Sequence, residues 1–265
     1  MVTSARRSMV VAVPFITYET AVWFRRQIAG DVDLVTLASI RADAIASAGL
    51  DMTALLHLAE RPDKAHVIAL PNLHAKVFVA DEKAAIVTSG NLTRSGLDRN
   101  IEYGVLLREP QLVRAIRADL SSFASLGNQV SRRELAELVS LEVDLRHAKK
   151  KAEADTDSEA RARFREIMRT ARPWFVRAHV GSRSANSVFG EAIRFVLARG
   201  PQPTTAITQE VSRLLPDLCD DSEELVINGE RYGKAWKHRL RNAQQYLKRR
   251  GAVTYDAGTK LWALR

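Results

Sequence analysis

The first half of the chain contains the run Leu73-His74-Ala75-Lys76-Val77-Phe78-Val79-Ala80-Asp81, in which His74 and Lys76 interrupt an otherwise apolar sequence. The β-branched and aromatic residues of this run predict a strand over His74–Ala80. Because residues two apart in a strand share a face, His74 and Lys76 point to the same side of the predicted sheet. The strand therefore presents an imidazole and an ammonium group together.

A second polar pair, Ser89 and Asn91, follows on the next segment of the chain and is also spaced two residues apart. If Glu82-Lys83 forms the two-residue tip of a hairpin, the strand pairing places His74 across from Asn91 and Lys76 across from Ser89. Four polar groups then converge on one patch. The tip contains no Gly or Asn, so a longer loop and a shifted register stay open.

The surrounding sequence predicts a layered α/β structure, because residues 1–128 alternate short apolar runs with helical patterns. The predicted strands are Met9–Ile16, Val32–Leu37, His66–Leu70, His74–Ala80, Ala84–Thr88 and Ile101–Leu107. The predicted helices are Tyr18–Ile28, Met52–Arg61 and Gln111–Leu126.

The polar motif, read as H-x-K-x4-D-x6-[GT]-S-x-N followed by N-x-E, resembles the phospholipase D superfamily, which includes lipid hydrolases and metal-independent nucleases. The residues in register with that motif are His74, Lys76, Asp81, Thr88, Ser89, Asn91 and Glu102. Val13-Pro14-Phe15-Ile16 and Ala54-Leu55 also resemble the family's arrangement, whereas Thr88 stands where Gly is commoner. The resemblance covers about the first 125 residues and implies a mixed sheet flanked by helices.

The resemblance implies a mechanism for these side chains. His74 is the expected nucleophile, which attacks phosphorus and carries a covalent phosphoryl group. Positive charge from Lys76 and hydrogen bonds from Ser89 and Asn91 stabilise the phosphate oxygens in the transition state. No metal and no cofactor are expected in such a site.

Two carboxylates complete the implied catalytic set. Glu102 is expected to accept a hydrogen bond from the ring nitrogen of His74 that does not attack, which fixes the tautomer of the imidazole. For Asp81 the family implies a structural role near the turn, so Asp81 ranks below the other residues.

Phosphodiester cleavage also needs a general acid, which a second histidine normally supplies in this family. The chain contains one full motif. The nearest other candidate is His147-Ala148-Lys149, which lies in a charged helical segment and lacks a following Ser-x-Asn. We therefore expect a homodimer in which two copies of His74 face each other across a two-fold axis.

Composition limits the class of protein. The chain has 265 residues and a formal net charge of +9. Counted along the sequence, residues 1–130 carry a net charge of +1, and the segments 131–185 and 186–265 carry +4 each, so the basic character lies in the second half. The single cysteine, Cys219, excludes an internal disulfide framework and suits the cytoplasm. The apolar run Met9–Ile16 is too short to span a membrane, and no membrane partner is expected.

The second half is predicted to form two further segments after a catalytic domain at residues 1–128. Residues 129–185 are interpreted as a charged helical connector, with a break at Asp155-Thr156-Asp157-Ser158. Residues 186–265 are predicted to form a winged helix-turn-helix domain. Its predicted elements are helices Ser187–Ala198, Thr204–Leu215 and Gly233–Arg250, and a hairpin of Ala252–Tyr255 and Lys260–Leu264.

The last of these helices is strongly basic, because residues 231–250 contain eight Lys and Arg and no acidic residue. An apolar stripe of Trp236, Leu240, Ala243 and Leu247 predicts one buried face. The residues expected to contact DNA are Lys234, Lys237, Arg239, Arg241, Gln244 and Lys248. This segment resembles the winged domains of bacterial restriction-type proteins. A module used only for dimerisation or protein contact is the alternative.

These observations together predict a phosphodiesterase that cleaves nucleic acid. DNA is the expected substrate, RNA stays open, and restriction or anti-phage defence is the biological role suggested by analogy. Lipid hydrolysis is the alternative enzyme class, although no amphipathic membrane helix is evident. A DNA-binding regulator with a vestigial catalytic domain is the non-enzymatic alternative.

Overall fold

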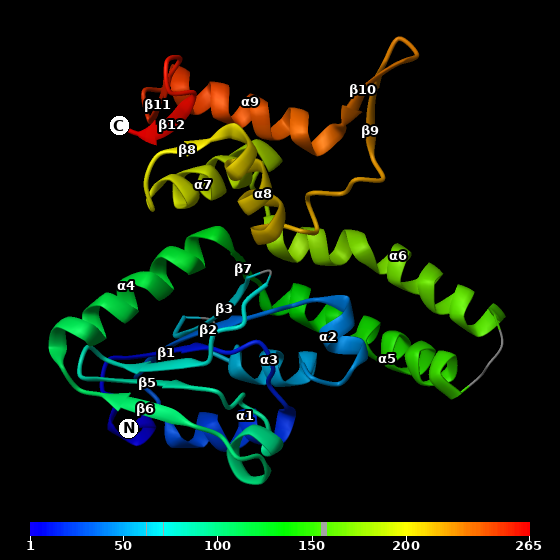
Figure 1. Ribbon diagram of the computed structural model, residues 1–265. Coiled ribbons are helices and arrows are strands. Elements are labelled where there is room, and N and C mark those ends of the chain that lie inside the picture. The colour runs from blue at the N-terminus through cyan, green and yellow to red at the C-terminus, as the bar shows by residue number, and fades with distance from the viewer. Residues whose placement is uncertain (62, 71, 155–157) are drawn as a thin grey trace. The chain divides into compact units, whose positions relative to one another are not determined.

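The computed structural model describes residues 1–61, 63–70, 72–154 and 158–265 (Figure 1). The chain divides into two compact units, Met1–Gly181 and Ser182–Arg265. Each unit has its own apolar core, and each is described by itself below.

The first unit is built on a seven-stranded mixed sheet with the order β6-β5-β4-β1-β2-β3-β7 (Figure 1). β1 (Ser8–Ala12), β2 (Asp33–Ala38) and β3 (Ala65–Ala69) are parallel to one another. The antiparallel strands are β4 (Val77–Ala80), β5 (Ala84–Thr88), β6 (Gly104–Leu107) and β7 (Asn128–Val130). The α/β fold class and all six predicted strands are confirmed, and β7 is an additional short strand at the edge.

Apolar side chains of the first helices pack on this sheet. Helix α1 (Tyr18–Gln27) buries Phe24, whose ring centroid lies 6.0 Å from that of Phe78 on β4. Helix α3 (Met52–Leu58) buries Leu55 in the same cluster, and the short helix α2 (Ala42–Ala46) precedes it. Met9 and Val11, on one face of the continuously apolar strand β1, and the helical spacing in α1 and α3 thus produce one continuous core.

Helix α4 (Pro110–Leu126) connects β6 and β7, the strands at the two opposite edges of the sheet. A 17-residue helix is about 25 Å long, and six inter-strand spacings amount to about 29 Å. The length of α4 therefore matches the width of the sheet that its chain must cross. Val113 and Leu120 are its buried anchors.

Helices α5 (Arg132–Ala154) and α6 (Ser158–Val180) belong to the first unit, whereas the sequence predicted a separate connector at residues 129–185. Leu138 and Leu145 of α5 join the same core as β1 and α3. Glu142 accepts a hydrogen bond from the backbone N–H of Met52, at 3.1 Å, at the start of α3. The predicted break falls largely on residues 155–157, outside the described residues. No helix in the described ranges, including these two long ones, is apolar enough to cross a membrane.

The second unit contains three helices and two small sheets. Its elements in chain order are α7 (Ala185–Leu197), β8 (Gln202–Pro203), α8 (Thr204–Leu214), β9 (Glu224–Ile227), β10 (Glu230–Lys234), α9 (Ala235–Arg249), β11 (Val253–Asp256) and β12 (Leu261–Leu264). The three-stranded sheet has the order β11-β12-β8, and β9 pairs with β10 as a separate hairpin. The three predicted helices and the terminal hairpin form, but the β9–β10 hairpin between α8 and α9 was not predicted.

Candidate active site

The strand that carries the motif begins later than predicted, at Val77 instead of His74. Its partner β1 ends at Ala12, which pairs with Val77, and Pro14 then follows in the chain. Proline has no backbone N–H and fixes its φ angle, so it does not continue a central strand. The residues from Leu73 to Lys76 therefore leave the β1 side of the sheet and enter the site as an irregular segment.

The hairpin between β4 and β5 has a register shifted by one residue from the predicted one. Ala80 pairs with Ala84 and Val77 with Val87, so three residues rather than two form the loop. Asp81 takes the left-handed conformation, with φ at 54°, that allows this turn. Extending the register places Lys76 beside Thr88, whose N–H donates to the Lys76 carbonyl at 3.0 Å. The predicted pairing of Lys76 with Ser89 is wrong for this reason.

His74 and Lys76 nevertheless lie together at the surface. The ammonium Nζ of Lys76 lies 3.4 Å from each ring nitrogen of His74 and donates to the His74 carbonyl at 3.0 Å. His74 is exposed and Lys76 is partly buried. An imidazole that faces solvent beside a fixed cation is placed to meet a phosphate from solution.

A second polar cluster lies at the junction of β5 and β6. Ser89 Oγ donates to Oε2 of Glu102, and Asn100 Nδ2 donates to Oε1 of the same carboxylate at 3.1 Å. The backbone N–H of Tyr103 also donates to Ser89 Oγ, at 3.0 Å. The hydrogen bonds from Ser89 and Asn100, and then the charge of Lys76, hold the pKa of Glu102 below its ordinary value. Lys76 thus links this cluster electrostatically to His74.

This arrangement corrects the role expected for Glu102. Its two carboxylate oxygens accept hydrogen bonds from Ser89 and Asn100 rather than from the ring of His74. The cause is the register, which places Ser89 next to Tyr103 on the β6 side of the sheet. In this structure Glu102 therefore orients Ser89, and its charge interacts with that of Lys76.

Asn91 lies on a tightly folded segment just beyond β5. Its Oδ1 is buried without a hydrogen-bond partner in the described part of the chain, and its Nδ2 makes no hydrogen bond there. A Cβ at Gly96 would lie 2.4 Å from the carbonyl oxygen of Asn91, so the close approach requires glycine. The loop thus holds Asn91 in place and leaves its amide N–H groups free to donate to a ligand.

Asp81 lies at the opposite end of β4 from His74. Its carboxylate accepts hydrogen bonds from the backbone N–H groups of Arg6, Arg7 and Ser8, at 2.8 to 3.3 Å. Burial raises the pKa of Asp81, but these hydrogen bonds outweigh it, and the pKa lies below its ordinary value. Asp81 thus fixes the start of β1 to the turn, consistent with the structural role that the family implies.

A small cleft opens beside His74. Its volume is about 280 Å³, and its polar lining includes Ser39, Arg41, Asp43, Asn72 and His74. Pro14 and Phe15 form part of the apolar wall. Sequence reasoning missed Arg41 and Asn72, because they follow different strands and nothing in their spacing connects them to the motif.

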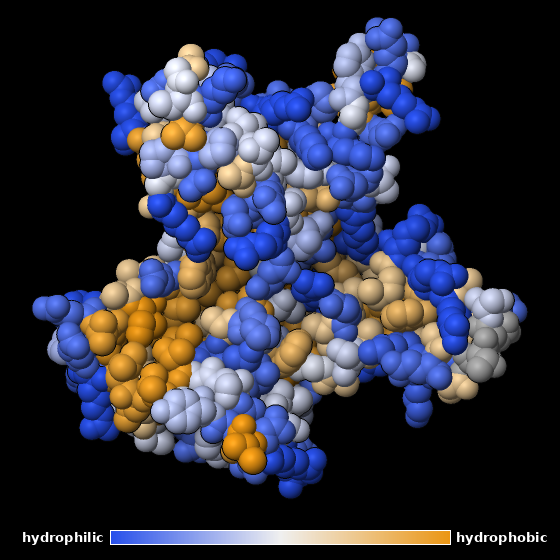
Figure 2. Space-filling model, in the orientation of Figure 1, coloured by the Kyte–Doolittle hydropathy of each residue, from blue (hydrophilic) through white to orange (hydrophobic). Residues whose placement is uncertain are grey.

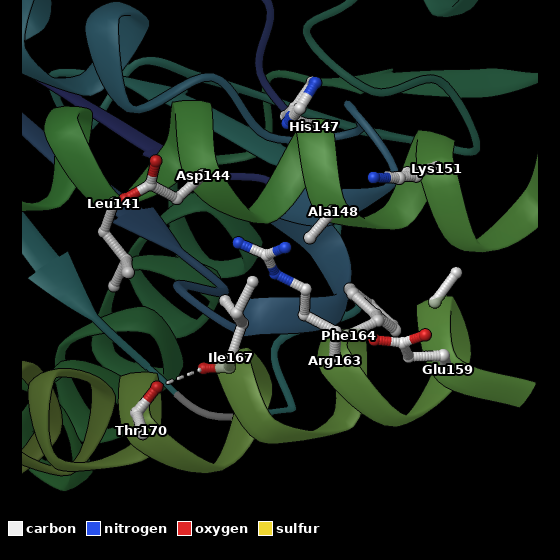
Figure 3. A pocket seen from close by; sticks show the side chains of 11 residues that line it. Leu141, Asp144, His147, Ala148, Lys151, Glu159, Arg163, Phe164, Ile167 and Thr170 are labelled. Carbon is white, nitrogen blue, oxygen red and sulfur yellow. Dashed lines mark hydrogen bonds between the residues drawn. The ribbon is translucent and has the colours of Figure 1, made fainter.

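The other histidine considered from the sequence, His147, lines a different cavity (Figure 3). This cavity of about 580 Å³ lies between α5 and α6, and Lys151, Arg163 and Phe164 also line it. Lys149, the lysine of the alternative motif, lies 3.6 Å from Glu153 on its own helix. Among the described residues, the cavity lining contains no serine and no asparagine, so it does not reproduce the polar set around His74.

Three of the six residues predicted to contact DNA are exposed on the basic helix α9. Trp236, Leu240 and Leu247 are buried, as the apolar stripe predicts. Arg239, Arg241 and Lys248 are exposed, whereas Lys234 and Lys237 are partly buried. Lys234 and Arg239 each lie within 4 Å of a glutamate of the preceding segment, Glu224 and Glu223 respectively.

The prediction that Gln244 contacts DNA is wrong. Its side chain is 2% exposed, so it belongs to the core and does not reach DNA. The physical reason is the helical period, which places position 244 one turn beyond Leu240 at the margin of the buried face. The solvent-facing side of α9 instead carries Asn242, Gln245 and Arg249, which sequence reasoning missed.

A comparison with protein families matches part of the first unit. Residues 30–124 match a family described as "Cardiolipin synthase, PLD-like domain". The match extends from the start of β2 into α4 and includes the whole polar motif from His74 to Glu102. A search of curated proteins gave no match.

Solved structures give weaker likenesses. The phospholipase D family member Nuc from Salmonella typhimurium superposes with a TM-score of 0.40 at 18% identity, over 49% of this chain and 85% of that one. NucT from Helicobacter pylori gives a TM-score of 0.42 at 13% identity, over 49% and 86%. TrmBL2, described as an archaeal chromatin protein with a novel mode of DNA binding, gives 0.37 at 12% identity, over 49% and 47%.

Proposed function

From the premise that residues 30–124 form a phospholipase D-like domain, we propose that the chain is a metal-independent phosphodiesterase that cleaves nucleic acid, with DNA as its main substrate, and that it acts as a homodimer. The observation that carries this proposal is the pair of exposed His74 and partly buried Lys76 beside the Ser89–Glu102 cluster. These residues offer a nucleophile, a cation and oriented hydroxyl and amide groups on one surface.

The proposed reaction has two displacements at phosphorus. A ring nitrogen of His74 attacks the phosphodiester, the bond between phosphorus and the leaving oxygen breaks, and that oxygen takes a proton from His74 of the partner subunit. Water then attacks the phosphohistidine, and the same partner imidazole accepts the proton of the water. Lys76 and Asn91 stabilise the negative charge on the phosphate oxygens in both steps.

The surface around the site supports a partner subunit. Ile101 is fully exposed and Tyr103 is 81% exposed, on either side of Glu102. Strand β6 is an edge strand that exposes Val105 and Leu106, and Figure 2 shows an apolar surface over β6 and the neighbouring part of α4. Exposed apolar groups at an unpaired sheet edge are typical of a surface that binds another chain. The site therefore borders a surface suited to a second copy.

The second unit supports nucleic acid rather than lipid as the substrate. We propose that Ser182–Arg265 is a winged-helix domain in which α9 contacts DNA, with Arg241 and Lys248 facing phosphates. The order of helices and the three-stranded sheet fit this proposal, although the β9–β10 hairpin replaces the short turn before the recognition helix. A role in restriction or anti-phage defence is part of the proposal and rests on analogy.

One experiment tests the reaction class and its independence from metal. Purified protein is incubated with labelled DNA, RNA and phosphatidylcholine, each with and without EDTA. Among the described residues no group of three or more His, Cys, Asp or Glu side chains could hold a metal ion, so we expect DNA cleavage to continue in EDTA. Loss of cleavage in EDTA that Mg²⁺ restores would overturn the metal-free mechanism. Hydrolysis of lipid alone would support a phospholipase, and DNA binding without cleavage would support a regulator.

A further inference from the structure

The cleft beside His74 has features that the chemistry at phosphorus does not use. It is lined on one side by His74 and also by Arg41, which follows β2, and by Asn72, which follows β3. At about 280 Å³ it is slightly smaller than most pockets for drug-sized ligands. It suits a single compact group next to the reacting phosphate.

Arg41 is held in a fixed orientation in this cleft. Its Nε and Nη2 donate to the two carboxylate oxygens of Asp43, at 2.9 and 3.1 Å, and its Nη1 donates to Oδ1 of Asn72 at 2.6 Å. A guanidinium group has five N–H donors, so one N–H on Nη1 and one on Nη2 have no partner among the described residues. These two donors are available to the oxygens of a phosphate, which a guanidinium group binds well.

The electrostatic objection is that Asp43 offsets the charge of Arg41. Asp43 is the more exposed of the two, with 63% of its side chain accessible against 37% for Arg41. Water screens an exposed carboxylate more strongly than a partly covered guanidinium. Asp43 thus acts mainly to aim the guanidinium, and binding depends on directed N–H groups rather than on net charge.

The apolar wall of the cleft adds a second feature. Phe15 is partly buried, and a Cβ at Gly49 would lie 3.1 Å from its ring, so the backbone at Gly49 fixes the position of the ring. Aromatic rings and prolines provide the surfaces on which sugars and bases of single-stranded nucleic acid pack. The cleft therefore combines hydrogen-bond donors for a phosphate with an apolar wall.

We propose that this cleft binds the nucleotide next to the scissile phosphate, with Arg41 donating to the flanking phosphate and Phe15 packing on its sugar or base. This inference rests on the proposed function and specifies its substrate as a polynucleotide with at least two successive phosphates. Arg41 is a substrate-binding residue in this proposal and takes no part in bond breaking.

The test compares substrates with and without a flanking phosphate charge. Wild type and Arg41→Ala are assayed on a trinucleotide with two internucleotide phosphates, on the two forms in which one or the other of these phosphates is a neutral methylphosphonate, and on bis(p-nitrophenyl) phosphate, which has a single phosphate. Arg41→Ala should raise KM for the trinucleotide by about tenfold. Methylphosphonate at one flanking position should cause a similar loss in wild type and little further loss in Arg41→Ala.

The matched control is Arg169→Ala. Arg169 on α6 makes a comparable bidentate ion pair with Glu166, at 2.6 and 2.9 Å, and does not line the cleft. Arg169→Ala should leave the KM for each of these substrates unchanged. Equal KM values for Arg41→Ala and Arg169→Ala, or a methylphosphonate effect of equal size in wild type and Arg41→Ala, would overturn the inference.

Binding measurements separate this inference from the proposed function. In a His74→Ala background, the Kd of the labelled trinucleotide should still weaken about tenfold on Arg41→Ala. If wild type cleaves none of the substrates but this difference in Kd is present, the reaction is refuted and the cleft assignment stands. If wild type cleaves DNA but Arg41→Ala changes neither Kd nor KM, the cleft assignment alone is refuted.

Discussion

Among single substitutions in the first unit, a change at His74 should affect cleavage most specifically. Replacing it with Ala removes the proposed nucleophile, so cleavage of DNA should fall about a thousandfold or more. DNA affinity should change little, because the basic helix α9 lies in the other unit. Rates of cleavage and Kd from fluorescence anisotropy measure the two effects separately. His147→Ala is the control, since His147 lines a cavity without the Ser and Asn companions; wild-type cleavage by His74→Ala would remove His74 from the mechanism.

Asp81 gives a prediction about stability rather than rate. Its carboxylate accepts backbone hydrogen bonds from Arg6, Arg7 and Ser8, and its pKa in the folded state lies below the ordinary value. The stabilisation is therefore complete above the pKa of the unfolded state, about 3.9, and is lost as the pH falls through the folded value. Asp81→Asn should lower the free energy of unfolding by about 2 kcal/mol at pH 7.

Urea denaturation at pH 7 and pH 3 measures this effect. The difference between wild type and Asp81→Asn should shrink at pH 3, because protonation of the carboxylate weakens the same hydrogen bonds in wild type. Asp119→Asn is the control, since Asp119 is exposed on α4 and its side chain has no hydrogen bond or ion pair with any described residue. A pH-independent difference for Asp81→Asn would show that its charge is not what stabilises β1.

At the scale of elements, periodicity and composition predicted the strands and helices of the first unit well, and the motif identified the site. The errors concern pairing. Strand β5 begins and ends as predicted, yet the register of its hairpin is shifted by one residue. The sequence Asp81-Glu82-Lys83 does not reveal a left-handed Asp81, because that conformation depends on backbone donors 73 or more residues earlier in the chain. The partners of Glu102 follow from a different pairing, that of β5 with β6, which places Ser89 beside Tyr103.

The second unit shows a different kind of omission. Asn228-Gly229, both with positive φ, forms the turn of the β9–β10 hairpin. This dipeptide is the strongest local signal for a two-residue hairpin, and it was present in the sequence. Both flanking strands are largely exposed; β9 is a short run of Glu-Leu-Val-Ile and β10 is mostly polar, so neither shows the apolar alternation that indicates a half-buried strand. The prediction for Gln244 was wrong because a polar residue at the margin of a buried helix face has the sequence pattern of a surface residue.

Helix α9 is the element whose role a salt titration resolves. Arg241 is exposed and has no ion pair in the described ranges, and Lys237 lies on the same flank with its ammonium 5.5 Å from the centroid of the Trp236 ring. Each phosphate neutralised on duplex DNA contributes about 0.9 to the slope of log affinity against log salt. The double variant Lys237→Ala/Arg241→Ala should therefore bind more weakly and reduce that slope by up to about 2.

The control for this titration has the same change of charge elsewhere. Lys150→Ala/Lys151→Ala removes two exposed cations from α5, in the first unit. We expect its salt slope to stay near that of wild type. Circular dichroism of both variants should match wild type, because none of the four side chains is buried. An unchanged slope in Lys237→Ala/Arg241→Ala would assign α9 to protein contact instead.

At the scale of the whole molecule, the proposed reaction needs two copies of His74, and each chain supplies one. In an equal mixture of wild type and His74→Ala chains that exchange freely, about a quarter of the dimers contain two wild-type chains. A heterodimer has one His74 imidazole, which serves either as the nucleophile or as the general acid, and lacks the second imidazole that the reaction needs. Activity should therefore fall to about a quarter rather than to half of the wild-type value. A fall in proportion to the wild-type fraction would show that each chain works alone.

The surface beside the site tests the same idea without changing a catalytic group. Ile101 is fully exposed in the single chain, so a charged residue there has no folded-state contact to break. In a dimer that covers Ile101, the variant Ile101→Asp places a carboxylate from each copy in an apolar interface, which should weaken association at least about tenfold. Analytical ultracentrifugation measures the dimer, and cleavage should decline in parallel. Val143→Asp is the matched control, because Val143 is exposed on α5 in the same unit. If Ile101→Asp keeps wild-type cleavage and association, this face does not bind the partner, and the second histidine reaches the phosphate by another surface.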